Sequence, residues 1–414
     1  MGELTFIDLF AGAGGLSEGY LRKGFTPLAH IEKDLYSCLT FKTRISYYYL
    51  QNNNKLDVYN KYLRNELSRE NLYSHIPPSL LNSVIHEEIT EDNYNIILEK
   101  IYSNLKIFGY KKVDVIIGGP PCQAYSVVGR ARDPYRKKRD SRNYLYKLYS
   151  KFLENIKPLI FVFENVPGFL SAGNEQLLKD AINHFHNAGY KVEYKILNSH
   201  NFGVLQKRER VILIGWKKEL QLHYPDFEKQ ENNKWSIKDV LSDLPSIQPG
   251  AKMLCRGYIS DPSEYLREYK IRTDDDILTL HMARGHNERD RHIYKLGIEK
   301  WEKERKRLKY TDVPEEFRTH KNLKSFLDRY KVVAGDLPFS HTVVAHIAKD
   351  GHYYIHPDIK QLRSLSVREA ARLQSFPDNY YFEGSMTSRF MQIGNAVPPL
   401  MSEKIAEKIK VMLK

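Results

Sequence analysis

The sequence predicts an α/β protein in which a second, smaller domain accompanies the main one. In the first 240 residues, short apolar runs alternate with amphipathic stretches. Such alternation is typical of parallel strands joined by helical crossovers, which form a sheet covered by helices on both faces. From about Trp235 the alternation stops. A chain of 414 residues with 42% hydrophobic residues has room for two or three domains, or for one large domain with an insertion.

Seven apolar runs account for the predicted strands: residues 4–10, 25–31, 83–89, 113–117, 159–163, 191–197 and 211–214. Between several of them lie amphipathic stretches, and residues 144–156 and 175–187 are predicted to be helices. Residues 45–81 interrupt this rhythm. They are rich in Tyr, Asn and Lys, and we interpret them as an insertion with some helix.

The last part of the chain is predicted to return to the first domain. A helical pattern resumes at residues 366–374, where Ser366 and Glu369 form a capping box. A final helix is expected over residues 399–413. The predicted domain limits are therefore 1–234 for the main domain with its insertion 45–81, 235–360 for the smaller domain, and 361–414 for the returning segment.

Composition excludes several classes of protein. The longest apolar run, residues 159–163, is far below the roughly 20 residues of a membrane-spanning helix. The first residues lack the pattern of a signal peptide, and Cys38, Cys122 and Cys255 are too few and too scattered for a disulfide framework. We expect a soluble protein of a reducing compartment. The net charge of +13 fits a polyanionic partner or a solvated charged surface.

A glycine-rich turn follows the first predicted strand, in the segment 8–15. Glycines between a strand and a helix let a ligand approach the backbone beside the positive end of the helix. Glu32, at the end of the second strand, is well placed for ribose hydroxyls. A dinucleotide fingerprint would need glycine at position 17, which is Ser17. The turn therefore suits a nucleoside cofactor better than a dinucleotide.

Three further motifs carry side chains that suit nucleophilic chemistry. Cys122 follows two prolines just beyond a strand, where a stiff loop would hold an exposed, reactive thiol over the ligand crevice. Glu164 comes just past another apolar strand, so a parallel sheet would place it at the same edge as Cys122. Arg208 and Arg210 alternate with β spacing and are predicted to point the same way, close to this edge.

Taken together, these motifs resemble the DNA (cytosine-5)-methyltransferase family. The resemblance lies in the ordered segments 8–15, 118–126, 164–166, 206–210, 368–374 and 392–398, and it covers nearly the whole chain. It implies a Rossmann-like domain that uses S-adenosylmethionine and a smaller, mixed target recognition domain. It further implies that Cys122 attacks C6 of a flipped cytosine while Glu164 contacts N3 and the exocyclic amine. Arg210 would bind the cytosine carbonyl, with Arg208 supporting it.

The resemblance also implies a cofactor site. Phe10 would stack on adenine, Gly12 and Gly14 would admit the methionine part, and Glu32 would bind ribose. Glu88 would contact the adenine, although Glu87 is an alternative because the family commonly has Asp at this place. The further cofactor-site residues implied are Asp8, Ala11, Gly15, Gly119, Pro121, Leu145, Asn395 and Val397.

Two basic segments carry the surplus charge of the chain. Residues 129–151 have a net charge of +7 and residues 284–331 a net charge of +6. The first follows Cys122, where relatives carry a loop that closes over DNA, and its cations suit phosphate contacts. The residues expected to contact nucleic acid are Gln123, Ser126, Arg130, Arg132, Arg142 and, near the end of the smaller domain, Thr342. No metal site is predicted, since His281, His286 and His292 lack cysteines or carboxylates at ligand spacing.

The predicted function is therefore sequence-specific methylation of cytosine C5 in duplex DNA. Two alternatives stay open: a tRNA cytosine-5 methyltransferase, disfavoured by a long recognition region without a Cys-Phe-Thr element, and an inactive DNA-binding paralogue, disfavoured because Cys122 and Glu164 are retained. By analogy, we expect a prokaryotic, cytoplasmic, nucleoid-associated monomer. A restriction endonuclease that acts separately is the expected partner.

Overall fold

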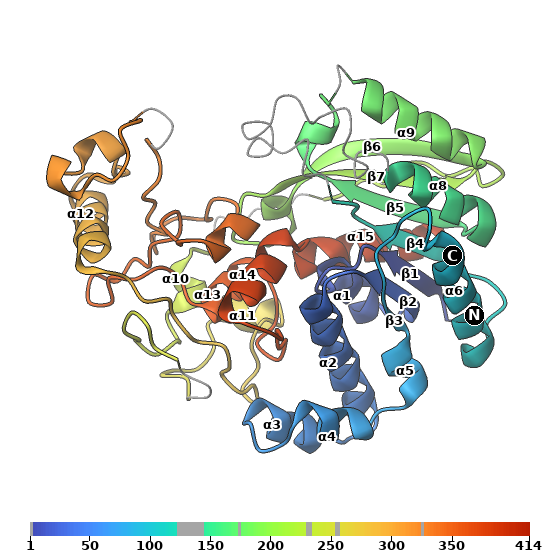
Figure 1. The fold of residues 1–414 in the computed structure, drawn as a ribbon, viewed down its shortest axis with the longest axis horizontal. Coiled ribbons are helices and arrows are strands. Elements are labelled where there is room, and N and C mark those ends of the chain that lie inside the picture. The colour runs from blue at the N-terminus through green and yellow to red at the C-terminus, as the bar shows by residue number, and fades with distance from the viewer. Residues whose placement is uncertain (1–2, 122–144, 173–174, 229–233, 253–256, 324–326) are drawn as a thin grey trace.

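The computed structural model describes residues 3–121, 145–172, 175–228, 234–252, 257–323 and 327–414. Its centre is a seven-stranded sheet with the order β3-β2-β1-β4-β5-β7-β6 (Figure 1). The strands are β1 (Thr5–Leu9), β2 (Thr26–Glu32), β3 (Val84–His86), β4 (Val115–Gly118), β5 (Ile160–Asn165), β6 (Tyr190–Asn198) and β7 (Glu209–Lys217). All seven predicted strands are present, and the predicted α/β class is confirmed.

One strand departs from the parallel arrangement expected from the sequence. The pairs β3–β2, β2–β1, β1–β4 and β4–β5 are parallel, whereas β7 is antiparallel to both β5 and β6. The connection from β6 to β7 covers only residues 199–208. A parallel crossover needs about a dozen residues or more, usually including a helix, so this short connection reverses the chain.

Helices cover both faces of the sheet because alternate strand residues point to opposite sides. Ile7, Ile116 and Phe161 pack in one core with α6 (Tyr94–Phe108), α8 (Leu145–Ile156) and α9 (Gln176–Asn187). Their strand neighbours Phe6, Val115 and Ile160 pack in a second core with α1 (Gly15–Arg22) and α15 (Pro399–Met412). The end of the chain thus lies against α1 (Figure 1).

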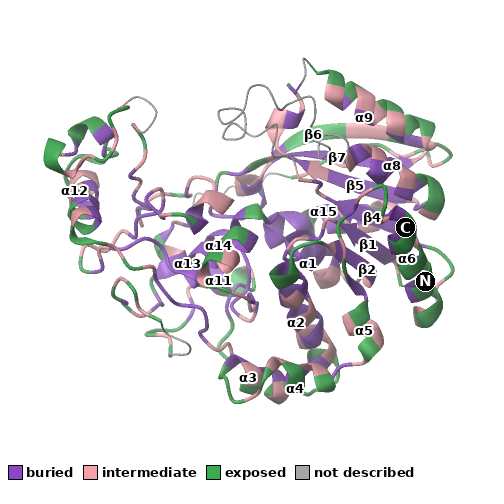
Figure 2. Ribbon diagram, viewed as in Figure 1, coloured by how far each residue is buried: buried purple, intermediate pink, exposed green. Residues whose placement is uncertain are grey.

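Between β7 and α15 the described residues form five α-helices of 4 to 17 residues joined by long irregular segments. These helices are α10 (Lys238–Leu241), α11 (Glu264–Glu268), α12 (Glu288–Glu304), α13 (Val367–Leu373) and α14 (Met386–Asn395). The capping box of Ser366 and Glu369 is present at the start of α13. Buried residues run through this part as well (Figure 2), and α12 packs over a separate small core around Tyr294 and Tyr310.

The predicted insertion forms helices that stand below the sheet in Figure 1. α2 (Leu35–Asn52) continues past position 45 without a break, and α3 (Leu56–Leu63), α4 (Arg69–Ser74) and α5 (Pro78–Asn82) follow. The strand–helix rhythm is therefore interrupted only after Asn52. Within the described ranges, no helix combines the length and the apolar character that crossing a membrane would require.

Candidate active site

The carboxyl ends of three neighbouring strands are in register at one edge of the sheet. Leu9 of β1 pairs with Gly118 of β4, which pairs with Phe163 of β5. The next residue of each strand is therefore at the same edge: Phe10, Gly119 and Glu164. Ligands of open α/β sheets bind at such carboxyl edges.

The glycine-rich turn at this edge is open on one side and tightly packed on the other. A Cβ added to Gly12 would meet nothing within 4 Å. Gly14, the N-cap of α1, has φ +84° and lies so close to Phe41 and Tyr380 that a Cβ would overlap both. Only glycine combines this φ with this close approach. Phe10 also has a positive φ, of 66°. The turn thus presents open space above Gly12, next to the start of α1.

Glu32 joins the end of β2 to this turn. Its carboxylate accepts a hydrogen bond from the amide of Gly12 at 2.8 Å, and further ones from Lys33 at 2.9 Å and Asp34 at 2.8 Å. Burial raises the pKa of Glu32, and the three amides act in the opposite direction. A carboxylate held in this way orients the turn and retains lone pairs for ligand hydroxyls.

Asp8 lies beneath the turn rather than in it. Its side chain is buried and accepts a hydrogen bond from Ser17 Oγ at 2.5 Å. Burial raises the pKa of Asp8 to about 8. This placement favours a supporting contact with α1 over the direct cofactor contact expected from the resemblance.

The two glutamates that compete for the adenine contact point in different directions. Glu88 is exposed, and its Oε1 lies 2.9 Å from Nζ of Lys33, the residue after Glu32. Glu87 forms an ion pair of 2.7 Å with Lys100 of α6. The amide of Glu87 donates to the carbonyl of Glu32 at 3.0 Å, so both glutamates lie next to the end of β2 and both stay candidates for the adenine contact.

Glu164 and Arg210 form an ion pair at the open edge. Arg210 Nε lies 2.6 Å from Glu164 Oε1, and both side chains are about one-eighth exposed (12% and 13%). The carboxylate rests on the backbone of Gly119, where any Cβ would overlap it. Gly119 therefore lets Glu164 lie across the end of β4, within reach of a bound ring.

Arg208 is more deeply buried than Arg210. Its guanidinium is completely buried and donates to the carbonyl oxygens of Val343 at 2.7 Å and Gly394 at 3.1 Å. Burial and the charge of Arg210 lower its pKa well below the usual value. Arg208 thus lies buried near Arg210 and Glu164, whose charges act on it, and it ties segments that lie far apart in the sequence.

The end of the chain completes the wall behind the turn. The carbonyl of Val397 lies so close to Gly15 that a Cβ on Gly15 would overlap it. Asn395, two residues before Val397, is exposed. Ala11 is buried. Pro121 and Leu145, the described residues on either side of positions 122–144, are half-buried. The predicted residues Cys122, Gln123, Ser126, Arg130, Arg132 and Arg142 lie outside the described residues.

Two polar residues that the sequence analysis did not single out organise this region. Gln206 donates from Nε2 to Gln374 Oε1 at 3.0 Å and accepts at Oε1 from the amide of Val343 at 2.8 Å. Tyr380 donates its hydroxyl proton to the carbonyl of Ala13, inside the glycine-rich turn. Gln206 and Gln374 belong to the segments 206–210 and 368–374, which carry the family resemblance. Tyr380 lies just after the second segment, but no local sequence pattern links it to Ala13.

Thr342 joins the backbone before β7 to the smaller domain. Thr342 Oγ1 donates to the carbonyl of Lys207 at 2.7 Å. Burial is the main cause that lowers the pKa of His341 to about 4. The positive charges of Lys331 and Arg307 lower this pKa further. We call Lys207, Arg307, Lys331, His341 and Thr342 the basic strip. It extends from the edge of the sheet into the smaller domain.

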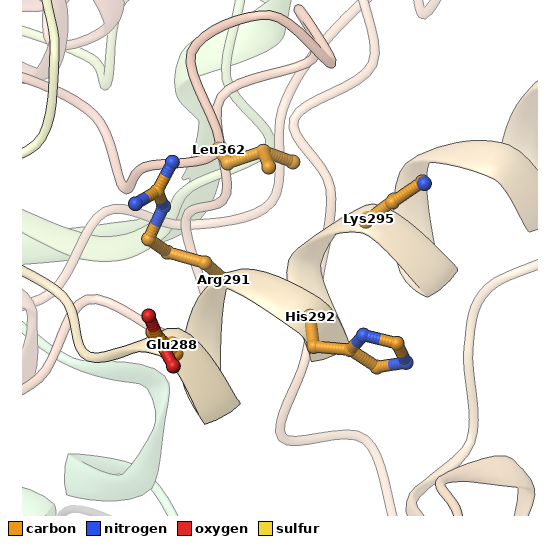
Figure 3. A pocket seen from close by; sticks show the side chains of 5 residues that line it. All are labelled: Glu288, Arg291, His292, Lys295 and Leu362. Atoms are coloured by element: carbon orange, nitrogen blue, oxygen red, sulfur yellow. The ribbon is translucent and has the colours of Figure 1, made fainter.

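A separate hollow of about 190 Å³ lies on α12, away from the sheet (Figures 1 and 3). Four of its lining residues, Glu288, Arg291, His292 and Lys295, stand at the spacing of one helix face. His292 also stacks near Phe317, with ring centroids 4.5 Å apart. This hollow contributes nothing to the edge of the sheet.

The other two histidines considered as metal ligands have ordinary polar contacts. His281 is hydrogen-bonded with Ser366 Oγ at 3.0 Å and with the carbonyl of Pro245 at 2.8 Å. His286 contacts Ser364 Oγ at 3.0 Å. These contacts satisfy both rings within the protein.

Comparisons with known proteins agree over almost the whole chain. The profile of the family described as C-5 cytosine-specific DNA methylase matches residues 4–68 and 82–411. The type II methyltransferase M.Bpa9945I of Bacillus paralicheniformis is 43% identical, over 98% of each chain. M.DdeI of Desulfomicrobium norvegicum is 32% identical, over 98% of this chain and 88% of that protein.

Solved structures share the fold. A crystal structure assigned to a prophage DNA modification methyltransferase from E. coli superimposes with a TM-score of 0.65 over 99% of both chains, at 24% identity. The Entamoeba histolytica methyltransferase EhMeth gives a TM-score of 0.55 over the full length of both chains, at 13% identity. At these identities the likeness is one of fold.

Proposed function

The chain belongs to the family of C-5 cytosine-specific DNA methylases, and from this membership and the geometry of the site we propose that it transfers a methyl group from S-adenosylmethionine to C5 of a cytosine flipped out of duplex DNA. The observation that carries the proposal is the Glu164–Arg210 pair, which stands at the sheet edge shared with the glycine-rich turn.

The residues around the turn fit S-adenosylmethionine. The space above Gly12 admits a ligand close to the backbone, and the Glu32 carboxylate is oriented for ribose hydroxyls. Glu88 would contact the adenine amine, and Phe10, the residue after β1, would stack on the adenine ring. When bound, the cofactor supplies an electrophilic methyl group. The chain's own residues then have to hold the cytosine next to it and activate C5.

Glu164 and Arg210 suit the recognition of one edge of cytosine. N3 and the carbonyl oxygen O2, which is attached to the neighbouring ring atom C2, lie on the same edge of cytosine. The two side chains that would bind them are neighbours at 2.6 Å. Glu164 would hold a proton at N3, and Arg210 would donate to O2. Protonation at N3 makes the ring electron-poor, which favours the addition of a thiolate at C6.

The nucleophile we assign is Cys122, one residue beyond the described Pro121. Its sulfur would form a bond to C6, and the electron pair displaced to C5 would take the methyl group. The bond from the methyl group to the sulfonium sulfur would break, with a neutral thioether as the leaving group. A solvent base would then remove the C5 proton. The returning electron pair would expel the thiolate, which restores the enzyme.

Arg208 would act as a positioning residue in this reaction. It holds Val343, beside Thr342 of the basic strip, against Gly394, beside the exposed Asn395. The DNA side and the cofactor side of the site therefore share one buried cation. Removal of its charge would loosen both.

The basic strip supports duplex DNA as the substrate. Its cations would contact phosphates on the side of the flipped base, and such contacts position DNA without reading its sequence. Since M.Bpa9945I and M.DdeI, both similar to this chain, are named type II methyltransferases, we propose that the protein protects DNA in a restriction-modification system, with the endonuclease on a separate chain.

Methyl transfer to defined substrates tests the proposal. The protein is incubated with methyl-tritiated S-adenosylmethionine and either duplex DNA or tRNA, and treated duplexes are sequenced after bisulfite conversion. Label in DNA and cytosines protected in one short sequence are the expected result. Label in tRNA alone would instead identify an RNA enzyme.

Cysteine variants separate an enzyme from an inactive binding protein. Cys122→Ser is expected to abolish transfer, whereas the matched control Cys255→Ser retains it. Duplexes containing 5-fluorocytosine should trap the wild type covalently. Absence of both transfer and trapping, with DNA binding retained, would indicate an inactive paralogue.

A further inference from the structure

We propose that the insertion after α2 positions the glycine-rich turn for its cofactor, through a chain of buried contacts that ends at Tyr380. The inference rests on the proposed function, because it takes the turn to be the S-adenosylmethionine site. We call this set of contacts the brace. It consists of α3 to α5, the segment 378–383 and Arg44 of α2.

The brace reaches the turn at Tyr380. The tyrosine is buried, donates to the carbonyl of Ala13, and has its hydroxyl against Gly14. Gly12 and Gly14 both have positive φ, and glycines give a turn little rigidity of their own. The position of this turn therefore depends on outside contacts. Tyr380 is one that holds it from the side opposite the open space.

Arg44 joins the segment 378–383 to the helix that follows the turn. Its guanidinium contacts both carboxylate oxygens of Glu18 in α1, at 2.6 Å and 2.9 Å. It also donates to Asn379 Oδ1 at 2.9 Å and lies 4.8 Å from the ring centre of Tyr380. The amide of Glu18 in turn donates to the carbonyl of Gly14. Turn, helix and segment are thus held by one buried cation.

The insertion holds the same segment from its far side. Tyr59 of α3 donates to the carbonyl of Asn379 at 2.8 Å, and Tyr62 donates to Glu383 Oε1 at 2.5 Å. The carboxylate of Glu383 also lies 3.7 Å from a guanidinium nitrogen of Arg69 in α4. Glu383 is almost fully buried, so its contacts fix the segment firmly.

Part of the brace lies outside the residues that the family profile matches. The family profile matches residues 4–68 and 82–411 and leaves out 69–81, which contain α4 and most of α5. Arg69 begins this unmatched piece. A ligand that binds a turn already held in place does not have to order it, so the brace should increase cofactor affinity rather than the rate of the chemical step.

The test compares cofactor binding by Tyr380→Phe and by a matched control. Tyr190→Phe also removes a buried hydroxyl that donates to a backbone carbonyl, that of Pro158 at 2.8 Å, at the opposite end of the sheet. Titration calorimetry with S-adenosylmethionine should give a Kd that is about 3- to 10-fold higher for Tyr380→Phe. The Kd of the control should equal that of the wild type. The KM for the cofactor should rise in parallel, while kcat at saturation and the Kd for DNA stay unchanged.

A second variant tests the insertion itself. Tyr62→Phe should raise the cofactor Kd by about 2- to 5-fold, and the double variant should fall short of the product of the two effects, because both act through one segment. Equal cofactor Kd values for wild type and Tyr380→Phe would overturn the brace while leaving the proposed function intact. A wild type that binds no S-adenosylmethionine would overturn both.

Discussion

Gly119→Ala is predicted to disable catalysis by displacing Glu164, without affecting the cofactor turn. A Cβ at position 119 would overlap Glu164 Oε2, whose partner Oε1 is held at 2.6 Å by Arg210. To restore ordinary contact, the carboxylate has to move by about 1 Å, and a misplacement of that size costs on the order of 10²-fold in rate. At 1.36 kcal/mol for each factor of ten, this corresponds to about 2.7 kcal/mol of transition-state stabilisation.

Single-turnover methyl transfer to duplex DNA measures this loss directly. We expect the rate of Gly119→Ala at saturating S-adenosylmethionine to fall about 100-fold. Gly285→Ala is the matched control, because a Cβ there meets nothing within 4 Å and its φ is not in the left-handed region. A rate for Gly119→Ala within twofold of the wild type would mean that Glu164 does not need its place against Gly119.

Three further outcomes are expected. Arg208→Met leaves the carbonyls of Val343 and Gly394 without their buried donor and should lower the free energy of unfolding in urea by about 1–3 kcal/mol; an unchanged midpoint would contradict this role. The raised pKa of Asp8, about 8, means that its protonated form stabilises the fold below about pH 4 and that this contribution is lost as pH rises towards 8. Asp8→Asn should therefore gain stability relative to wild type between pH 5 and pH 8, and a difference independent of pH would speak against it. Lys207→Gln should reduce the salt slope of DNA binding by about 1, whereas Lys111→Gln, at the other end of the sheet, should leave it unchanged.

Much of the fold was predictable because its determinants are local. Each strand is a short apolar run, and each run is visible in the sequence whatever it later packs against. The direction of β7 was not predicted, since the strand pattern is the same in either direction. The short connection 199–208 that decides it became clear only once the bounds of β6 and β7 were known.

The insertion shows the opposite case. Its composition marked residues 45–81 as unusual, yet its contacts with Asn379 and Glu383 join residues more than 300 positions apart. No periodicity encodes such a pairing, because it depends on how α2 and the end of the chain come together. The role of Tyr380 was hidden for the same reason.

By itself, the sequence determined which chemical groups stand at the ends of which strands. Phe10 ends the run 4–10, Gly119 comes two residues after the run 113–117, and Glu164 directly follows the run 159–163. The register of a parallel sheet brings such positions to one edge. Only the tertiary structure decided how equivalent neighbours differ. Arg210 reaches Glu164 at the edge while Arg208 is buried among carbonyls, because packing against the distant Val343 and Gly394, rather than spacing along the strand, determines which guanidinium remains accessible.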